Sequence, residues 1–314
     1  MGDIKKGLVI KSTGSFYRVK TELSLIDCKI RGKFRKKGFR STNPVAVGDF
    51  VWYDYDERNK IGIIKDIEDR KNYIVRKSIN LSKQIHIIAA NVDVVFLVVT
   101  LSVPETTTMF IDRFLVSSEA YHIPVVLLFN KIDLYQDADI ERMDYLISVY
   151  ENIGYECKKT SAITGEGVGY LKEKMTGEVC AFAGHSGVGK SSLVKAINKD
   201  IELKIEEISD IHLTGKHTTT FAEMYEWEKD SYIIDTPGIK AFGLIDLEKK
   251  EIAHYFPEIL KISSNCKFQN CIHLHEPKCA VKKAVEEKEI EDFRYYNYLQ
   301  MLEDEGEKHR LSLR

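Results

Sequence analysis

The sequence contains no apolar run long enough to cross a lipid bilayer. Its most apolar stretch, residues 87–103, is interrupted by Asn91 and Asp93 and predicts a buried strand with its flanks. Residues 1–11 lack the continuous apolar core and the small-residue cleavage site of a secretory signal. Internal repeats and low-complexity tracts are also missing. The sequence therefore predicts a globular, cytoplasmic protein without a membrane anchor.

Cysteine is scarce, with six residues in a chain of 314, and its placement favours metal ligation over a disulfide framework. Three cysteines and a histidine crowd into one short segment: Cys266, Cys271, His273 and Cys279. Three thiolates and one imidazole match a closed tetrahedral site for one zinc ion, which stabilises the fold and leaves no open position for catalysis. His275 is an alternative ligand beside His273, and free or redox-active thiols are the alternative to zinc.

A strong overall charge is also missing, because the formal net charge is only −2. Residues 1–77 nevertheless hold 19 Lys and Arg against 10 Asp and Glu, a balance of +9, and the remainder has a balance of −11. A basic module joined to an acidic body is typical of a protein with a polyanionic partner, since each phosphate neutralised by Lys or Arg releases counterions.

The basic segment has the pattern of a small β-barrel. Short β-type runs at residues 8–10, 16–19, 49–53 and 62–64 are separated by Gly, Asn and charged turns, which predicts an OB-fold over residues 1–75. The loop at residues 31–40 interleaves cations with Phe34 and Phe39. Cations that meet phosphates beside rings that stack on bases indicate RNA contact; the alternative is a solvated loop with both rings in the barrel.

Strands alternate with helical segments over residues 76–245. Apolar runs at residues 94–99, 125–129 and 179–183 predict strands buried on both faces, and residues 109–121 and 140–150 predict helices. Such alternation predicts an α/β domain with a parallel sheet covered on both sides. Residues 246–314 become polar and helical around the cysteine cluster, which predicts a helical zinc-binding domain.

A phosphate-binding loop follows the apolar strand at residues 179–183 and opens a helix. Glycines let backbone N–H groups turn inward around phosphate oxygens, and the helix N-terminus adds partial positive charge. Lys190 is expected to neutralise the β and γ phosphates and Ser191 to bind Mg²⁺. The residues expected to line this part of the site are Gly184, His185, Ser186, Gly187, Val188, Gly189, Lys190, Ser191 and Ser192.

A guanine-reading motif, Asn130-Lys131-Ile132-Asp133, follows the strand at residues 125–129. The Asp133 carboxylate can accept two hydrogen bonds that guanine donates and adenine does not, which disfavours an ATPase. Asn130 is expected to bind the base edge and brace the loop, with the Lys131 stem against the purine. Ser161 and Ala162 follow the next strand, where a backbone N–H can meet the guanine oxygen.

The remaining nucleotide motifs lie after the phosphate loop. The sequence Asp235-Thr236-Pro237-Gly238 ends a strand and places a carboxylate near Mg²⁺ and a glycine N–H near the γ-phosphate. Between loop and strand, Thr219 is the expected second Mg²⁺ ligand, with Thr218 as the alternative. All these motifs occur at strand ends, in an order that is a rotation of the usual one, because the guanine motif precedes the phosphate loop. This order indicates a circularly permuted GTPase.

The whole arrangement resembles the ribosome small subunit-dependent GTPase A (RsgA) family of bacterial circularly permuted GTPases. The resemblance covers the barrel, the GTPase domain with its Gly-Lys-His-Thr-Thr-Thr and Asp-Thr-Pro-Gly motifs, and the cysteine/histidine module. It implies an OB-fold, GTP hydrolysis to GDP stimulated by the 30S ribosomal subunit, and a role in late maturation of that subunit. It also implies 16S rRNA as partner, with no DNA and no membrane; we expect a monomer.

The sequence lacks the glutamine that orients the attacking water in many GTPases, since Ile239 takes its place and cannot hydrogen-bond water. Slow intrinsic turnover is therefore expected. His217, beside the candidate metal-binding threonines, is our hypothesis for positioning the water; the alternative is that it caps, packs or contacts the ribosome. Ile239 also leaves open an RNA-binding scaffold that uses GTP only as a structural ligand. A partner in tRNA or rRNA modification is a third alternative, without a visible modification site.

Overall fold

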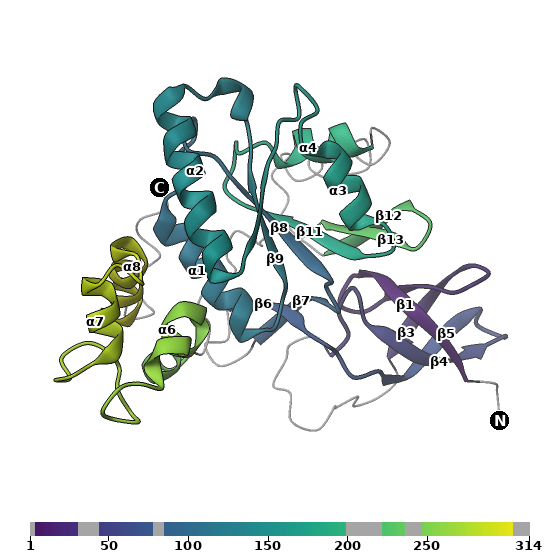
Figure 1. The fold of residues 1–314 in the computed structure, drawn as a ribbon. Coiled ribbons are helices and arrows are strands. Elements are labelled where there is room, and N and C mark those ends of the chain that lie inside the picture. The colour runs from purple at the N-terminus through teal and green to yellow at the C-terminus, as the bar shows by residue number, and fades with distance from the viewer. Residues whose placement is uncertain (1–3, 31–43, 78–84, 199–221, 236–246, 304–314) are drawn as a thin grey trace.

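The computed structural model describes residues 4–30, 44–77, 85–198, 222–235 and 247–303 (Figure 1). Within them the chain forms a β-barrel at the lower right of Figure 1, an α/β domain in the centre and a helical module at the lower left. The largest sheet has the strand order β10-β9-β8-β11-β13-β12-β1-β2-β3-β5-β4 and so runs through both the α/β domain and the barrel. Every helix in these ranges is too short or too polar to span a bilayer.

The barrel closes because β4 pairs with β1 as well as with β5. Its pairings are antiparallel except between β3 and β5, and this five-stranded closure confirms the predicted OB-fold. Gly62 is needed where β5 pairs with β3, because a Cβ there would lie 2.4 Å from the sulfur of its partner Cys28. The barrel strands are β1 (Lys5–Ser12), β2 (Tyr17–Lys20), β3 (Leu25–Ile30), β4 (Phe50–Asp56) and β5 (Ile61–Ile67).

In the described residues, the α/β domain contains five parallel strands and one antiparallel edge strand, β12. All six residues of β8 are buried, with alternate side chains facing opposite cores. This two-sided burial is the physical reason for the continuous apolar run, and it confirms the predicted parallel sheet. The strands are β8 (Val94–Val99), β9 (Val125–Phe129), β10 (Glu156–Lys159), β11 (Val179–Ala183), β12 (Glu223–Glu228) and β13 (Ser231–Asp235).

Helices cover both faces of this sheet. The core on one face combines odd-numbered residues of β8 with α1 (Thr108–Ala120) and α2 (Asp137–Ile153). The core on the other face combines even-numbered residues of β8 with α3 (Val168–Met175) and α4 (Lys190–Ile197). The short 3-10 helix η1 (Ile132–Leu134) follows β9. Because these strands are parallel, the described loops at the carboxyl ends of β8, β9, β10 and β11 meet at one edge of the sheet.

A separate two-stranded sheet, β6 (Tyr73–Lys77) and β7 (Ile85–Ala90), connects the barrel to the α/β domain. The prediction of one buried strand in residues 87–103 was too coarse, because Asn91 with φ of 55° ends β7 and starts the turn to β8. The Asn91 side chain donates to the Gly48 carbonyl at 2.9 Å, which holds this turn against the barrel.

The barrel contacts the α/β domain through the edge strand β12. Lys11 on β1 pairs in register with Glu223, and their side chains form an ion pair at 2.7 Å. Lys20 on β2 contacts Glu226 and also donates to the Tyr232 hydroxyl at 2.6 Å. The barrel thus covers a sheet edge whose unpaired backbone would otherwise be open to other strands.

The helical module packs on α1 through a buried ionic network. Arg294 and Asp112 are 1% and 0% exposed, and their nearest atoms lie 2.5 Å apart. Arg294 also pairs with Glu258 at 2.7 Å, while Asn297 and Tyr150 donate to the Asp112 carboxylate. The elements of the module are η3 (Lys249–Tyr255), α6 (Pro257–Ser263), α7 (Ala280–Glu286) and α8 (Asp292–Glu303).

Replacing Arg294 by methionine should lower the free energy of unfolding by about 3–5 kcal/mol, because Asp112 is left charged, buried and unpaired. Urea titration of the two proteins measures this difference. The control is Arg142→Met, whose guanidinium pairs with Glu105 at the surface at 2.8 Å and should contribute no more than about 1 kcal/mol. Equal losses in the two variants would contradict the importance of the buried network.

Candidate functional site

The predicted phosphate loop lies between β11 and α4, at the carboxyl edge of the sheet. Gly184, Gly187 and Gly189 have φ of 134°, 84° and 96°. Residues other than glycine rarely adopt backbone angles in this region. A Cβ on Gly184 would lie 2.4 Å from the Val98 carbonyl oxygen, and one on Gly189 would lie 2.4 Å from the Asn130 side-chain nitrogen. Glycine is therefore required both for the turn and for the close approach of neighbouring strands.

Lys190 places its ammonium over this loop. Its Nζ donates to the carbonyls of Gly184 at 2.9 Å and His185 at 2.6 Å. Ser191 and Ser192 lie in the first turn of α4 and are exposed. The ammonium, the helix N-terminus and the two hydroxyls thus gather donors and positive charge on one side of the loop, which suits a polyphosphate with its metal ion.

Asn130 connects the guanine motif to the phosphate loop. It is 1% exposed, and its Nδ2 donates to the Val188 carbonyl at 2.8 Å. Its Oδ1 accepts a hydrogen bond from the Thr160 hydroxyl at 3.1 Å, in the loop that follows β10. One buried amide therefore joins three loops, and the bracing role expected for Asn130 is present. Its contact with the base stays a prediction.

The other residues of the guanine motif are also positioned by hydrogen bonds. The Ser161 hydroxyl donates to the exposed Asp133 carboxylate, and Lys131, at φ of 63°, donates through its ammonium to the Val103 carbonyl at 2.8 Å. The backbone N–H of Ser161 is engaged with the Glu166 carbonyl at 3.0 Å. Of the two amides nominated for the guanine oxygen, Ala162 is therefore the better candidate.

Several predicted site residues lie outside the described part of the chain: His217, Thr218, Thr219, Gly238 and the loop at residues 31–40. Asp235 ends β13, which pairs in parallel with β11, so its backbone lies at the same carboxyl edge as the phosphate loop. The structure thus brings the guanine motif, Ser161, Ala162 and the phosphate loop to one edge, with the end of β13 beside them.

The segment between β8 and α1 borders the site and was missed by sequence reasoning. A Cβ on Gly187 would come within 3.5 Å of Pro104, the Val103 carbonyl binds Lys131, and the rings of Phe110 and His185 lie 3.8 Å apart. This segment carries no recognisable motif. The one local signal is Thr107, which caps α1 by accepting from the Phe110 N–H and so fixes where the helix begins.

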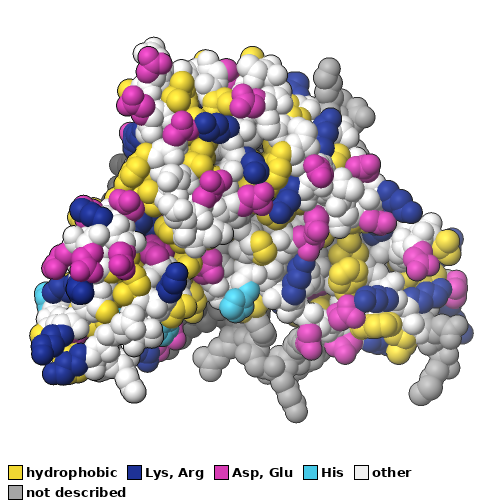
Figure 2. Space-filling model, viewed as in Figure 1, with side chains coloured by type: hydrophobic (Ala, Val, Ile, Leu, Met, Phe, Trp, Pro, Cys, Tyr) yellow, Lys and Arg dark blue, Asp and Glu magenta, His cyan; other side chains and the backbone are white. Residues whose placement is uncertain are grey.

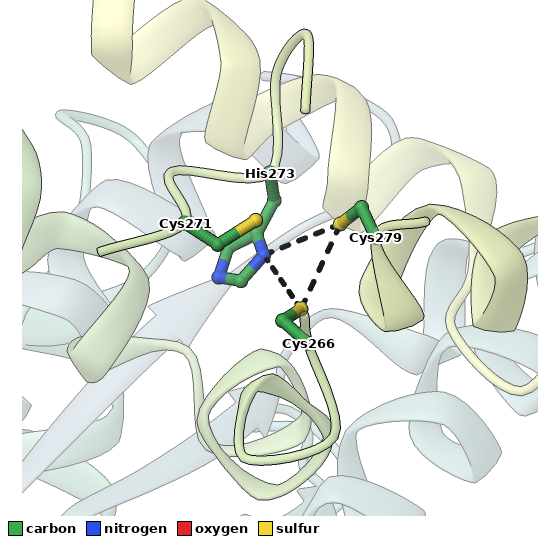
Figure 3. A group of neighbouring side chains, drawn as sticks. All are labelled: Cys266, Cys271, His273 and Cys279. Atoms are coloured by element: carbon green, nitrogen blue, oxygen red, sulfur yellow. Dashed lines mark hydrogen bonds between the residues drawn. The ribbon is translucent and has the colours of Figure 1, made fainter. Parts of the chain in front are cut away.

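The four predicted zinc ligands converge in the helical module (Figure 3). Their ligand atoms all lie within 4.8 Å of one another, and the His273 Nδ1 is 3.6 Å from Cys266 Sγ and 3.4 Å from Cys279 Sγ. Tetrahedral bonds to zinc of about 2.3 Å for sulfur and 2.0 Å for nitrogen place ligand atoms roughly 3.5–3.8 Å apart. The cluster therefore fits zinc. His275 is exposed and not part of it.

Surrounding groups hold the metal-binding loop in place. The Tyr295 and Tyr298 hydroxyls of α8 donate to the backbone carbonyls of His273 and Ile272, each at 2.6 Å. The Glu276 carboxylate accepts backbone N–H groups, including that of Ile272 at 2.8 Å, and these bonds lower its pKa against the opposing effect of burial. Hydrogen bonds from α8 and from Glu276 thus orient the metal-binding loop.

Replacing Cys266 by serine should reduce the zinc content from about one equivalent per chain to near zero, because a closed site loses one of its four ligands. Metal analysis of the purified protein measures the content. Cys157→Ser changes a buried thiol outside the cluster and should leave the zinc content unchanged. Zinc retained in Cys266→Ser, or absent from the unaltered protein, would contradict the assignment.

Comparison with known proteins agrees with this geometry. The model of the RsgA GTPase family matches residues 67–245, and that of the RsgA N-terminal domain matches residues 6–64. A Bacteroides fragilis protein named small ribosomal subunit biogenesis GTPase RsgA is 58% identical over 303 residues, 96% of this chain and 97% of that protein.

Two crystal structures have the same architecture. YjeQ from Thermotoga maritima is 36% identical with a TM-score of 0.77, covering 96% of this chain and 98% of its own. YloQ, described as a circularly permuted GTPase, is 31% identical with a TM-score of 0.74, covering 96% of this chain and 94% of its own. From the matched motifs, the shared fold and these relatives, we conclude that the chain belongs to the RsgA family of circularly permuted GTPases.

Proposed function

We propose that this protein binds the 30S ribosomal subunit through its 16S rRNA in the cytoplasm and hydrolyses GTP to time its release during late maturation of that subunit. The observation that carries the proposal is the buried Asn130 side chain, which fastens the guanine motif to the phosphate loop through the Val188 carbonyl at 2.8 Å. The names of the relatives support the ribosomal role.

The nucleotide is bound by groups with complementary charge. Asp133 accepts the two guanine N–H donors, Lys190 and the loop amides bind the phosphates, and Ser191 and Thr219 bind Mg²⁺ with Asp235 nearby. Mg²⁺ held by these residues would supply positive charge that offsets the charge developing on the phosphate. The exposure of Asp133 beside a buried Asn130 supports this division between recognition and bracing.

His217 positions the attacking water in this proposal. Ile239, which follows Gly238, has no hydrogen-bonding group on its side chain. Turnover by the isolated protein is consequently slow, and the 30S subunit accelerates it. The alternative function, an RNA-binding scaffold with GTP as a structural ligand, is favoured only by Ile239.

RNA contact is supported by exposed rings paired with cations on the barrel. Phe16 is 45% exposed with the Lys29 ammonium 4.4 Å from its ring centroid, and Phe50 is 37% exposed with the Lys6 ammonium at 4.7 Å. Such pairs combine stacking with phosphate attraction. We assign residues 1–75 to RNA binding, residues 76–245 to GTP and residues 246–314 to zinc, in a protein that acts as a monomer.

Asp133→Asn should weaken GTP binding by about 100-fold, because two hydrogen bonds to a charged acceptor contribute about 1.5–3 kcal/mol each and the amide cannot accept both. Fluorescent GTP and ATP analogues measure affinity and specificity. Asp137→Asn removes an exposed carboxylate four residues away, at the start of α2, and should bind GTP normally. Equal affinity of the unaltered protein for the two analogues would rule out guanine reading.

Purified 30S subunits should increase GTP turnover by the unaltered protein, and His217→Ala should lose most of that increase while still binding GTP and subunits. Phosphate release with and without subunits measures it. His122→Ala, at the turn after α1, is the control and should keep the stimulation. Full stimulation of His217→Ala would remove the catalytic role of His217, and no stimulation of the unaltered protein would favour the scaffold.

A further inference from the structure

The β8–α1 loop, residues 100–107, is held in one conformation by its own hydrogen bonds. The Thr100 hydroxyl donates to the Pro104 carbonyl at 2.5 Å, and the Thr106 N–H donates to the Thr100 carbonyl at 2.8 Å. The Tyr135 hydroxyl accepts the Leu101 N–H at 2.9 Å. Thr100 and Thr106 are 0% and 1% exposed. Because buried hydrogen bonds are costly to break, this loop can act as a fixed support for its neighbours.

Two parts of the nucleotide site lie against the β8–α1 loop. The Lys131 ammonium of the guanine motif donates to the Val103 carbonyl at 2.8 Å. A Cβ on Gly187 of the phosphate loop would lie 3.5 Å from the Pro104 ring, which is ordinary van der Waals contact. The loop therefore borders both the guanine motif and the phosphate loop, although it carries no nucleotide-binding motif of its own.

Phe110, three residues after this loop, contacts the phosphate loop through its ring. The ring centroid lies 3.8 Å from that of the His185 imidazole, closer than the 5.2 Å between Phe96 and Phe182 in the sheet. Thr107 accepts the Phe110 N–H and so fixes where α1 begins. Phe110 also packs against the core that α1 and α2 share with the sheet. Its position is thus set by the helix and the core, and His185 packs on a fixed ring.

His185 in turn contacts the lysine of the phosphate loop. Its backbone carbonyl accepts a hydrogen bond from the Lys190 ammonium at 2.6 Å. Gly184 and Gly187 on either side have φ of 134° and 84°, and glycine loses more conformational freedom on ordering than any other residue. A loop with so much glycine depends on contacts from outside to stay ordered. The ring of Phe110 supplies such a contact at the residue that also holds Lys190.

The order of this loop matters because surface charge gives little help. The face of the molecule in Figure 2 mixes Lys and Arg side chains with Asp and Glu side chains, so it has no broad field of one sign that would attract a triphosphate. Binding then depends on a few donors of the phosphate loop and on how well they are placed before the ligand arrives.

We propose that Phe110 is a positioning residue for GTP, which acts by stacking on His185 and so keeps the phosphate loop in the conformation that receives the phosphates. A loop ordered before binding avoids a loss of conformational entropy on binding, which raises the affinity. In the opposing interpretation His185 binds phosphate through its own imidazole, and Phe110 only fills the core. The proposal concerns nucleotide binding and is independent of the ribosomal role.

The test compares Kd values of full-length variants for a non-hydrolysable GTP analogue, measured by titration calorimetry. Phe110→Leu keeps an apolar side chain but removes the ring, and it should raise the Kd by about fivefold, the size of effect expected from one aromatic pair. His185→Ala removes the other ring and should raise the Kd by the same factor. Urea titration of each variant establishes that it is folded under the binding conditions.

The double variant distinguishes a shared contact from two separate effects. Phe110→Leu combined with His185→Ala should raise the Kd by about fivefold, no more than either single change, because both remove the same interaction. A rise of about 25-fold, the product of the two single effects, would mean that the two residues act independently and would overturn the proposal.

His185→Phe separates ring packing from imidazole chemistry. This variant keeps an aromatic ring beside Phe110 but cannot donate a hydrogen bond to phosphate. Its Kd should stay within about twofold of that of the unaltered protein. A Kd as high as that of His185→Ala would assign phosphate binding to the imidazole and contradict the positioning role.

Met109→Ala is the matched control. Met109 precedes Phe110 in the first turn of α1 but packs against the core of the helical module. This variant should be less stable, yet its Kd should change less than about twofold. A fivefold rise in Met109→Ala would show that any damage to the start of α1 weakens binding, and the role of the ring would be lost. Unchanged Kd values in Phe110→Leu and His185→Ala would also overturn the proposal, whereas GTP binding by the unaltered protein would leave the proposed function in place.

Discussion

The hydrogen bond from the Asn130 side chain to the Val188 carbonyl is the constraint on which the nucleotide site depends. The guanine motif follows β9 and the phosphate loop follows β11, so the two are separated in the chain. The parallel sheet delivers both to one edge, and the buried amide then fixes their distance. Gly189 must be glycine because this contact leaves no room for a Cβ. A substitution that moves the guanine motif therefore also moves the phosphate loop, and the reverse holds as well.

The helix α1 serves two parts of the molecule at once. Phe110 in its first turn packs on the His185 ring of the phosphate loop, with ring centroids 3.8 Å apart. Asp112, two residues further along α1, receives Arg294 and Asn297 from α8. The same α8 holds the zinc loop through Tyr295 and Tyr298. Burial makes these polar contacts costly to break singly, since each would leave an unpaired charge or donor.

The sequence predicted the features that have a local signature. The strands β8, β9 and β11 were predicted with the bounds they have, because burial on both faces makes them continuously apolar. The strand β3 was missed because Asp27 and Lys29 alternate with its inward residues, and β12 was missed because an edge strand is half polar. Short sequence motifs predicted the glycines of the phosphate loop, Lys190 and Asp133. They also predicted the four candidate metal ligands.

Features that depend on distant residues were beyond sequence reasoning. Arg294 and Asp112 are separated by 182 positions, and a lone arginine on a helix normally indicates a solvated face rather than a buried ion pair. The role of Asn130 as a brace was expected from its motif, but its partner Val188 was not, because a backbone carbonyl carries no side-chain identity.

The contact between β1 and β12 has a consequence for the edge of the α/β sheet, because it covers the backbone of β12. The antiparallel strand β12 is the last strand on one side of the α/β sheet, and it pairs there with Lys11 of the barrel. Ion pairs with Glu223 and Glu226 hold the barrel there. The barrel therefore also covers this edge of the sheet, and a chain without the barrel would expose β12 to pairing with an edge strand of another molecule.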